Sequence, residues 1–129
     1  MEIVLLRTEG RGGEAEVEVN GAQLMVVDAL SPADAPTRPG KLPGARLEVI
    51  AIPKLSRIAP EDAPEAAPLR HERGWRYRAR ARVLATEPLQ VDLGAFTAAL
   101  ELPLRGEITV GALLDLAIDR IVLSAGSTR

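Results

Sequence analysis

The feature that most constrains the fold is a pair of strand patterns joined by Asn20-Gly21. Residues 14–19 alternate acidic and apolar side chains with a period of two, and residues 22–27 continue with a second strand pattern. Asn and Gly both tolerate the positive φ of a type I′ turn, so the pair predicts a two-residue β-hairpin. That turn sets Val17 opposite Leu24. The face expected in the core consists of Ala15, Val17, Val19, Leu24 and Val26.

The rest of the chain predicts more short strands separated by turns and proline-rich loops. Further strands are expected at 2–7, 46–52, 75–84, 89–93 and 96–102. The proline-rich segments 31–44 and 59–74 predict loops, since proline breaks both helices and central strands. Residues 110–123 fit either a strand or a helix. We therefore expect one all-β, mainly antiparallel domain over 1–129, with at most one short helix. Its architecture would be a small closed or partly open barrel, in one version of the oligonucleotide-binding (OB-like) type, or a small sandwich.

Composition excludes several classes of protein. The chain has 129 residues, a net charge of −2 and no cysteine, which excludes disulfides, thiolate nucleophiles and cysteine-ligated metals. Its first residues fit neither a signal peptide nor a membrane span, so a cytoplasmic protein with no membrane partner is expected. All but two of its 16 basic residues are arginine. Together with the many alanines, prolines and glycines, this bias is typical of a GC-rich bacterial genome.

No pattern for catalysis or metal binding emerges. The single histidine, His71, lies in the second proline-rich segment, and no Gly-x-Ser-x-Gly motif accompanies it. Asp115 and Asp119 share a face whether their segment is a strand or a helix, but no other candidate ligand gathers around them. We expect no catalytic residues, no metal and no cofactor. An enzyme with a carboxylate-based site is the least favoured alternative.

The most distinctive segment is 75–84, where every second residue is arginine. Alternation on a strand turns the aromatic, alanine and valine side chains to one face and the arginines to the other. Two further arginines precede the segment, and Glu72 is the only acidic residue between 70 and 82. The candidate binding residues are therefore Arg70, Arg73, Arg76, Arg78, Arg80 and Arg82.

Two interpretations of this arginine face stay open. In the first, an adjacent strand supplies Glu14, Glu16 and Glu18 for a cross-strand ladder of ion pairs. In the second, the arginines bind an anionic partner, such as a protein, a second copy of the chain, a phosphorylated ligand or nucleic acid. Nucleic acid is disfavoured because Trp75 and Tyr77 are expected to point away from the arginines. We expect a non-catalytic binding or assembly module; the alternative is an oligonucleotide-binding barrel that uses the arginine face.

Overall fold

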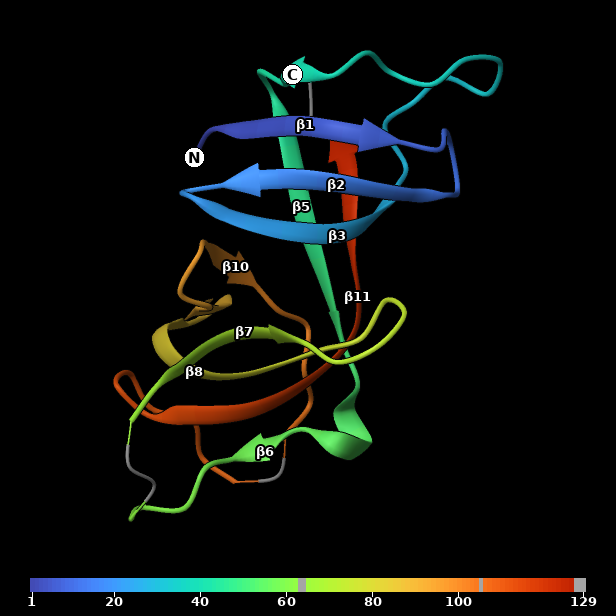
Figure 1. The fold of residues 1–129 in the computed structure, drawn as a ribbon. Helices are drawn as coiled ribbons and strands as arrows, with labels where there is room; N and C mark the ends of the chain where they lie inside the picture. Colours follow the sequence, from blue (N-terminus) through green and yellow to red (C-terminus); the bar gives the residue numbers. More distant parts are fainter. Residues whose placement is uncertain (63–64, 105, 127–129) are drawn as a thin grey trace. The chain divides into compact units, whose positions relative to one another are not determined.

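The computed structural model describes residues 1–62, 65–104 and 106–126 (Figure 1). In these residues it contains eleven strands and a single 3-10 turn, Pro53–Leu55, with no α-helix. The predicted all-β, mainly antiparallel class is confirmed. The strand path of these residues runs from β10 to β4 and is not closed by hydrogen bonds. The OB-like form stays a prediction.

The chain divides into two compact units. The terminal unit comprises residues 1–48 and 121–129, and the central unit comprises residues 49–120. A single domain over 1–129 stays a prediction. The terminal unit holds β1 (Ile3–Thr8), β2 (Glu14–Val19), β3 (Ala22–Asp28) and β4 (Gly40–Lys41). The central unit holds β6 (Arg57–Ile58), β7 (Ala67–His71), β8 (Tyr77–Thr86), β9 (Leu89–Asp92) and β10 (Thr97–Ala99). Two strands contribute to both units: β5 (Ala45–Ala51) and β11 (Leu113–Ala125).

The β2–β3 hairpin confirms the prediction made from Asn20-Gly21. Both turn residues have positive φ, 50° for Asn20 and 82° for Gly21, and Val17 pairs with Leu24. All five side chains expected in the core are buried, at 5% exposure or less. β1 pairs with β2 on the other side and adds Ile3 and Leu5 to this core.

A buried carboxylate organises the loop that follows β3. Asp28 is 1% exposed and accepts hydrogen bonds from the backbone N–H groups of Leu30 and Ser31, both at 2.8 Å. Its other oxygen accepts from the Ser31 hydroxyl at 2.6 Å and from the Thr8 hydroxyl. Burial disfavours the charged form, but the bonds from Ser31, Thr8 and the backbone together lower the pKa of Asp28. Asp28 is therefore ionised in the folded protein, and its carboxylate stabilises this turn.

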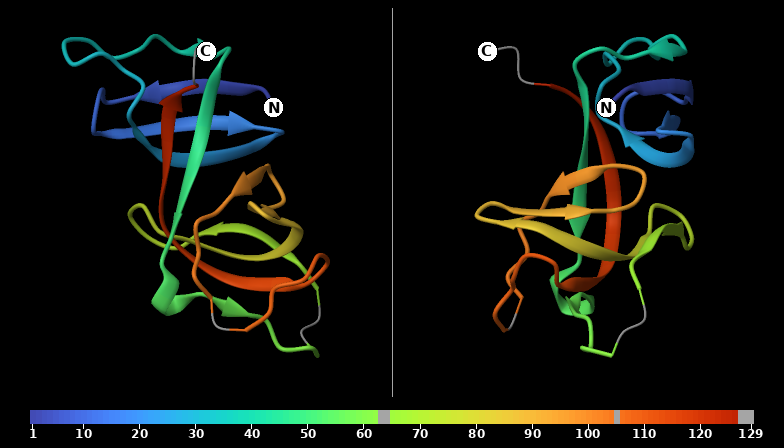
Figure 2. Two further views of the ribbon diagram at one scale, coloured as in Figure 1. Left: turned by 180° about the vertical axis from the view of Figure 1, so that it is seen from behind. Right: turned by 90° about the vertical axis from the view of Figure 1, so that its left-hand side faces the viewer.

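The central unit is built on β8, whose alternation matches the prediction. Tyr77, Ala79, Ala81 and Val83 are buried, and the arginines lie on the opposite face. The strand begins at Tyr77, two residues later than expected. β8, β9 and β10 form an antiparallel meander, drawn in yellow to orange in Figure 2. Residues 113–118 of β11 pair with β8, so the segment left open between strand and helix is a strand.

One loop prediction is partly wrong. The segment 59–74 contains β7, which pairs with the first half of β8. Pro68 is tolerated because β7 has β8 as its single ladder partner, and the register shifts between Ala67 and Arg70. Residues 63–64 of this segment lie outside the described residues. The other proline-rich segment, 31–44, contains only the two-residue strand β4, as a loop prediction requires.

Candidate anion-binding groove

Four strands of the central unit form a local antiparallel sheet in the order β7-β8-β11-β6. Register places Arg78 beside Arg70 on one side and Ala117 on the other. One row along, Arg80 lies beside Asp115, which in turn lies beside Arg57 of β6. Partners in register point to the same face of a sheet. Because the intervening Ala79 and Leu116 are buried, the charged groups all lie on the outward face.

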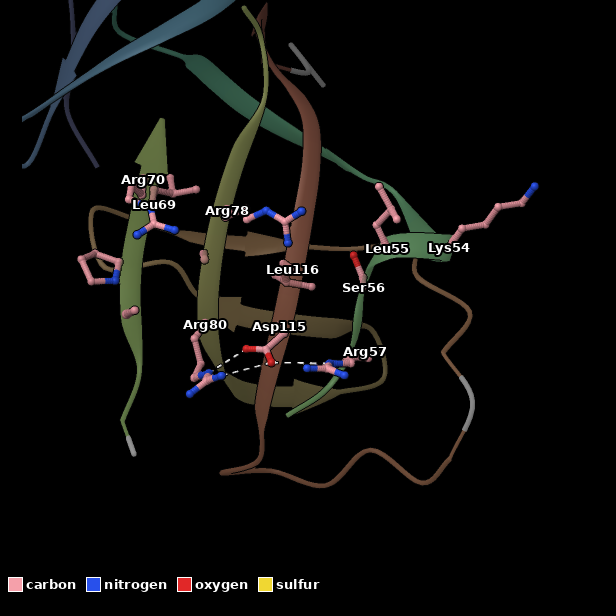
Figure 3. A pocket seen from close by; sticks show the side chains of 13 residues that line it. Lys54, Leu55, Ser56, Arg57, Leu69, Arg70, Arg78, Arg80, Asp115 and Leu116 are labelled. Atoms are coloured by element: carbon pink, nitrogen blue, oxygen red, sulfur yellow. Dashed lines mark hydrogen bonds and ion pairs between the residues drawn. The ribbon is translucent and has the colours of Figure 1, made fainter. Parts of the chain in front are cut away.

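A groove of about 790 Å³ opens on this face (Figure 3). The floor comes from β8 and β11, one wall from β7, and the other from β6 with the 3-10 turn before it. Five of the lining side chains are basic: Lys54, Arg57, Arg70, Arg78 and Arg80. Asp115 is the single carboxylate among the lining residues. The lining residues therefore carry a formal charge of +4.

Asp115 lies on the floor, between Arg80 of β8 and Arg57 of β6, and holds Arg80 in place. Arg80 donates through Nε to Oδ1 at 2.6 Å and through Nη2 to Oδ2 at 3.2 Å. The hydrogen bonds from Arg80 to Asp115 outweigh partial burial and raise the pKa of the guanidinium. Arg57 approaches the same carboxylate from β6, with Nε 3.8 Å from Oδ2 (Figure 3). One carboxylate thus serves two arginines.

The other two arginines of β8, Arg78 and Arg82, also donate hydrogen bonds to nearby residues. Arg78 donates to Glu72 at 2.5 Å, and Arg82 donates to the carbonyl oxygen of Gly111 at 2.9 Å. Of the two interpretations left open for the arginine face, the ladder with the acidic hairpin is wrong, because β2 pairs with β1 and β3 and not with β8. Within the terminal unit, Arg7 instead bridges Glu14 at 2.6 Å and Glu16 at 3.1 Å.

Two basic residues on opposite walls of the groove have no counter-charge. In the part of the chain that the structure describes, the side chains of Arg70 on β7 and of Lys54 in the 3-10 turn make no hydrogen bond or ion pair. Both side chains are exposed. Arg70 therefore adds uncompensated positive charge at the β7 wall, whereas the Lys54 side chain extends away from the groove (Figure 3).

The groove contains half of the predicted arginine set and three further charged residues that the sequence did not indicate as binding residues. Arg70, Arg78 and Arg80 line it, whereas Arg73, Arg76 and Arg82 do not. Lys54, Arg57 and Asp115 were missed as binding residues because each joins the site through long-range pairing. The alternation of β8 could not show which strands flank it.

Ser56 anchors the β6 wall through its side chain. Its Oγ donates to the carbonyl oxygen of Ile52 at 2.8 Å and accepts from the backbone N–H of Ala117 at 3.1 Å. The Ser56 hydroxyl is buried, and it accepts the hydrogen bond that a backbone carbonyl of a neighbouring strand would accept from β11 in a regular ladder. The single histidine, His71, places Nε2 2.7 Å from the carbonyl oxygen of Gly74 and its ring against Tyr77. The structure therefore shows Ser56 in a positioning role.

The described residues contain no group of three His, Asp or Glu side chains placed to hold a metal ion. Asp119, the second carboxylate considered for such a site, pairs with the adjacent Arg120 at 2.6 Å. No aromatic side chain is among the groove's lining residues. Nor does any helix within the described ranges have the length and apolar character needed to cross a membrane.

No protein-family model, curated protein or solved structure matches this chain. The chemistry of the groove is therefore defined by the residues that line it. Those residues combine guanidinium groups held by carboxylates, an uncompensated arginine on the β7 wall and a single carboxylate on the floor. This set suits the binding of a ligand with more than one negative charge.

Proposed function

We propose that the protein is a non-catalytic binding module whose groove takes an anionic partner. The observation that carries the proposal is the excess of positive charge along one groove, which has five basic residues against one carboxylate and an uncompensated Arg70 on its β7 wall. Exposed basic side chains without counter-charges favour the approach of an anion and raise the rate of association. The absence of cysteine is compatible with a reducing cytoplasm, the location that we propose.

The central arginine supports this function through its preorganisation. Arg80 spends two N–H groups on Asp115, and a guanidinium carries five donors in all. Three donors therefore remain for a ligand, on a side chain whose rotamer is already fixed. Fixing the rotamer in advance lowers the entropy lost on binding. Asp115 thus fixes the rotamer of Arg80, although its own charge lowers the net positive charge of the groove by one unit.

An oligonucleotide partner is less well supported. Proteins that bind single-stranded nucleic acid combine a basic groove with aromatic side chains on which the bases stack. The lining residues include no aromatic side chain, and Tyr77 and Phe96 are buried. The groove offers charge without a stacking platform, which favours a partner recognised through carboxylates or phosphates alone.

The test is binding of a fluorescein-labelled glutamate-rich peptide, followed by fluorescence anisotropy at low ionic strength. Arg57→Glu combined with Arg70→Glu should weaken binding at least tenfold, because both walls then repel the ligand. The matched control is Arg73→Glu with Arg76→Glu, which makes the same charge change in the same unit at residues outside the groove. Equal losses in the two double variants, or no binding by the native protein, would overturn the proposal.

A further inference from the structure

Two neighbouring rows of the local sheet differ in where their carboxylates lie. In one row, Asp115 lies between Arg80 and Arg57 and contacts both. In the next row, nearer the turn between β7 and β8, the β11 residue beside Arg78 is Ala117, which brings no charge. The Arg78 side chain leans from β8 toward β11 (Figure 3). The strand that supplies a carboxylate to one row therefore supplies none to the other.

The second row holds two arginines that lie directly opposite each other. Arg70 of β7 pairs in register with Arg78 of β8, and both are exposed and line the groove. The Cβ atoms of such a pair lie about 5 Å apart, and like charges in these positions destabilise a sheet. Within the described ranges, Arg70 has no counter-charge. An anion bound by both guanidinium groups would relieve their repulsion.

The counter-charge of Arg78 comes from a residue that does not line the groove. Glu72, two residues after Arg70, accepts a hydrogen bond from Nε of Arg78 at 2.5 Å. The contact is single, whereas Asp115 accepts two hydrogen bonds from Arg80. The side chains of Arg78 and Glu72 are 52% and 36% exposed, so water screens their attraction. Glu72 therefore holds Arg78 loosely, as a carboxylate that a stronger anion can replace.

These contacts select the kind of anion. Glu72 is part of the same chain, so its effective concentration at Arg78 is high, and a separate carboxylate of equal charge competes with it poorly. A phosphomonoester carries a charge of about −1.5 to −2 and three strong acceptor oxygens, so one group can neutralise both arginines. A phosphodiester strand has a charge on every phosphate. A second phosphate in the next row, about 7 Å along the strands, would meet Asp115.

Resting on the proposed anion binding, we infer that Arg70 and Arg78 form a subsite for the phosphoryl group of a phosphomonoester. The phosphoryl oxygens accept hydrogen bonds from both guanidinium groups, and Glu72 releases Arg78 when the ligand binds. Arg80 stays bound to Asp115. The phosphoryl group belongs either to a phosphorylated side chain of a protein or to a small phosphate compound, and both present the same chemistry to the two arginines.

The experiment uses three labelled peptides with one uncharged sequence that differ at a single central residue: phosphoserine, glutamate or serine. In fluorescence anisotropy at low ionic strength, the native protein should bind the phosphoserine peptide at least about tenfold more tightly than the glutamate peptide. Arg70→Gln should reduce this preference to less than about threefold, because a single arginine is left for the phosphoryl group. Arg76→Gln, the matched control, removes an arginine outside the groove and should leave the preference unchanged.

A second variant tests the part given to Glu72. Glu72→Gln removes the competing carboxylate and should raise the affinity for the phosphoserine peptide by about threefold or more. Glu87→Gln makes the same charge change at an exposed residue of the central unit outside the groove, and should change the affinity by less than about 1.5-fold. Equal gains in the two variants would overturn the competition by Glu72, because net charge alone would then account for them.

Competition with inorganic phosphate identifies the source of the phosphoryl group. If the unlabelled phosphoserine peptide displaces the labelled one at a far lower concentration than phosphate does, the ligand is a phosphorylated segment of a protein. If phosphate displaces it equally well, the ligand is a small phosphate compound. Either result supports the subsite.

The failure of this inference differs from the failure of the proposed function. If neither the phosphoserine peptide nor a glutamate-rich peptide binds at low ionic strength, the proposed function itself is wrong. If the glutamate-rich peptide binds but the phosphoserine and glutamate peptides bind equally, the groove binds anions and the phosphoryl subsite is overturned. Tighter binding of a single-stranded oligothymidine than of the phosphoserine peptide would overturn it as well.

Discussion

Asp28 in the terminal unit and Asp115 in the central unit are both strand carboxylates that organise their neighbours, yet their surroundings differ. Asp28 is 1% exposed and all four donors that it binds are neutral. Asp115 is partly exposed and binds two arginines at the floor of a groove. The first arrangement satisfies a carboxylate with donors fixed by the fold, which stabilises a turn. The second leaves most of the surrounding positive charge uncompensated, which suits a partner.

The largest expected effect is on stability, at Asp28. Asp28→Ala leaves two backbone N–H groups and two hydroxyls without their acceptor in a buried site. We expect the free energy of unfolding to fall by about 3 kcal/mol. Urea denaturation measures the change. Asp34→Ala, at an exposed position of the same loop, is the control and should change the value by less than about 0.5 kcal/mol. Similar midpoints for the two variants would show that the Asp28 network contributes nothing.

The next effect concerns the β7 wall of the groove. A Cβ added at Gly94 would lie 2.7 Å from Cβ of Pro68, so either β7 or the turn that holds Gly94 must shift. We expect Gly94→Ala to cost about 2 kcal/mol and to weaken peptide binding, because Arg70 moves with its strand. Gly111→Ala is the matched control: φ is 89° against 91° for Gly94, but a Cβ there meets no atom within 4 Å. Equal losses would assign the effect to backbone strain alone.

A smaller effect follows from the lowered pKa of Asp28. The unfolded chain takes up the proton near the ordinary value of about 3.9, before the folded protein does. The ionic contribution of Asp28 is therefore complete above that pH and is lost as the pH falls through the native pKa. The stability gap between the native protein and Asp28→Asn should narrow from neutral pH to about pH 3. Urea titrations of both proteins across that range measure it. A gap that stays constant would contradict the lowered pKa.

The smallest effect on stability is expected at Asp115, the carboxylate that the comparison sets against Asp28. Asp115→Asn should change the free energy of unfolding by less than about 0.5 kcal/mol, since its ion pairs are partly exposed to water. The same variant should bind a glutamate-rich peptide a few-fold more tightly, because a negative charge leaves the groove. A large loss of stability without a gain in affinity would make Asp115 a structural residue like Asp28.

Local patterns predicted the local structure well. Asn20-Gly21 gave the hairpin and its register, and alternation placed the buried and exposed sides of β8 correctly. The partners of those strands could not be predicted, because pairing is decided by the fold of the whole chain. Ser56 and Ala117 are joined across 61 positions, and the acidic strand that matched the arginines in period pairs with its own neighbours instead.

The site was predictable to the same extent. Arg78 and Arg80 could be assigned to an outward face from alternation alone. Arg70 could be named, but the strand that carries it contains Pro68, which argued for a loop. No local sequence pattern marks Lys54 or Asp115 as a binding residue. They line the same groove only because of the order in which four strands pair.

The order in which the strands occur along the chain has a consequence for biosynthesis. Residues 49–120 are inserted between Glu48 and Ile121 of the terminal unit. Val122 and Leu123 of β11 pair in parallel with the end of β3, and Leu123 is fully buried. A ribosome therefore completes the central unit before it delivers the last strand of the terminal one. Until then, the end of β3 lacks the strand that pairs with it, although the Asn-Gly turn of its hairpin can already form.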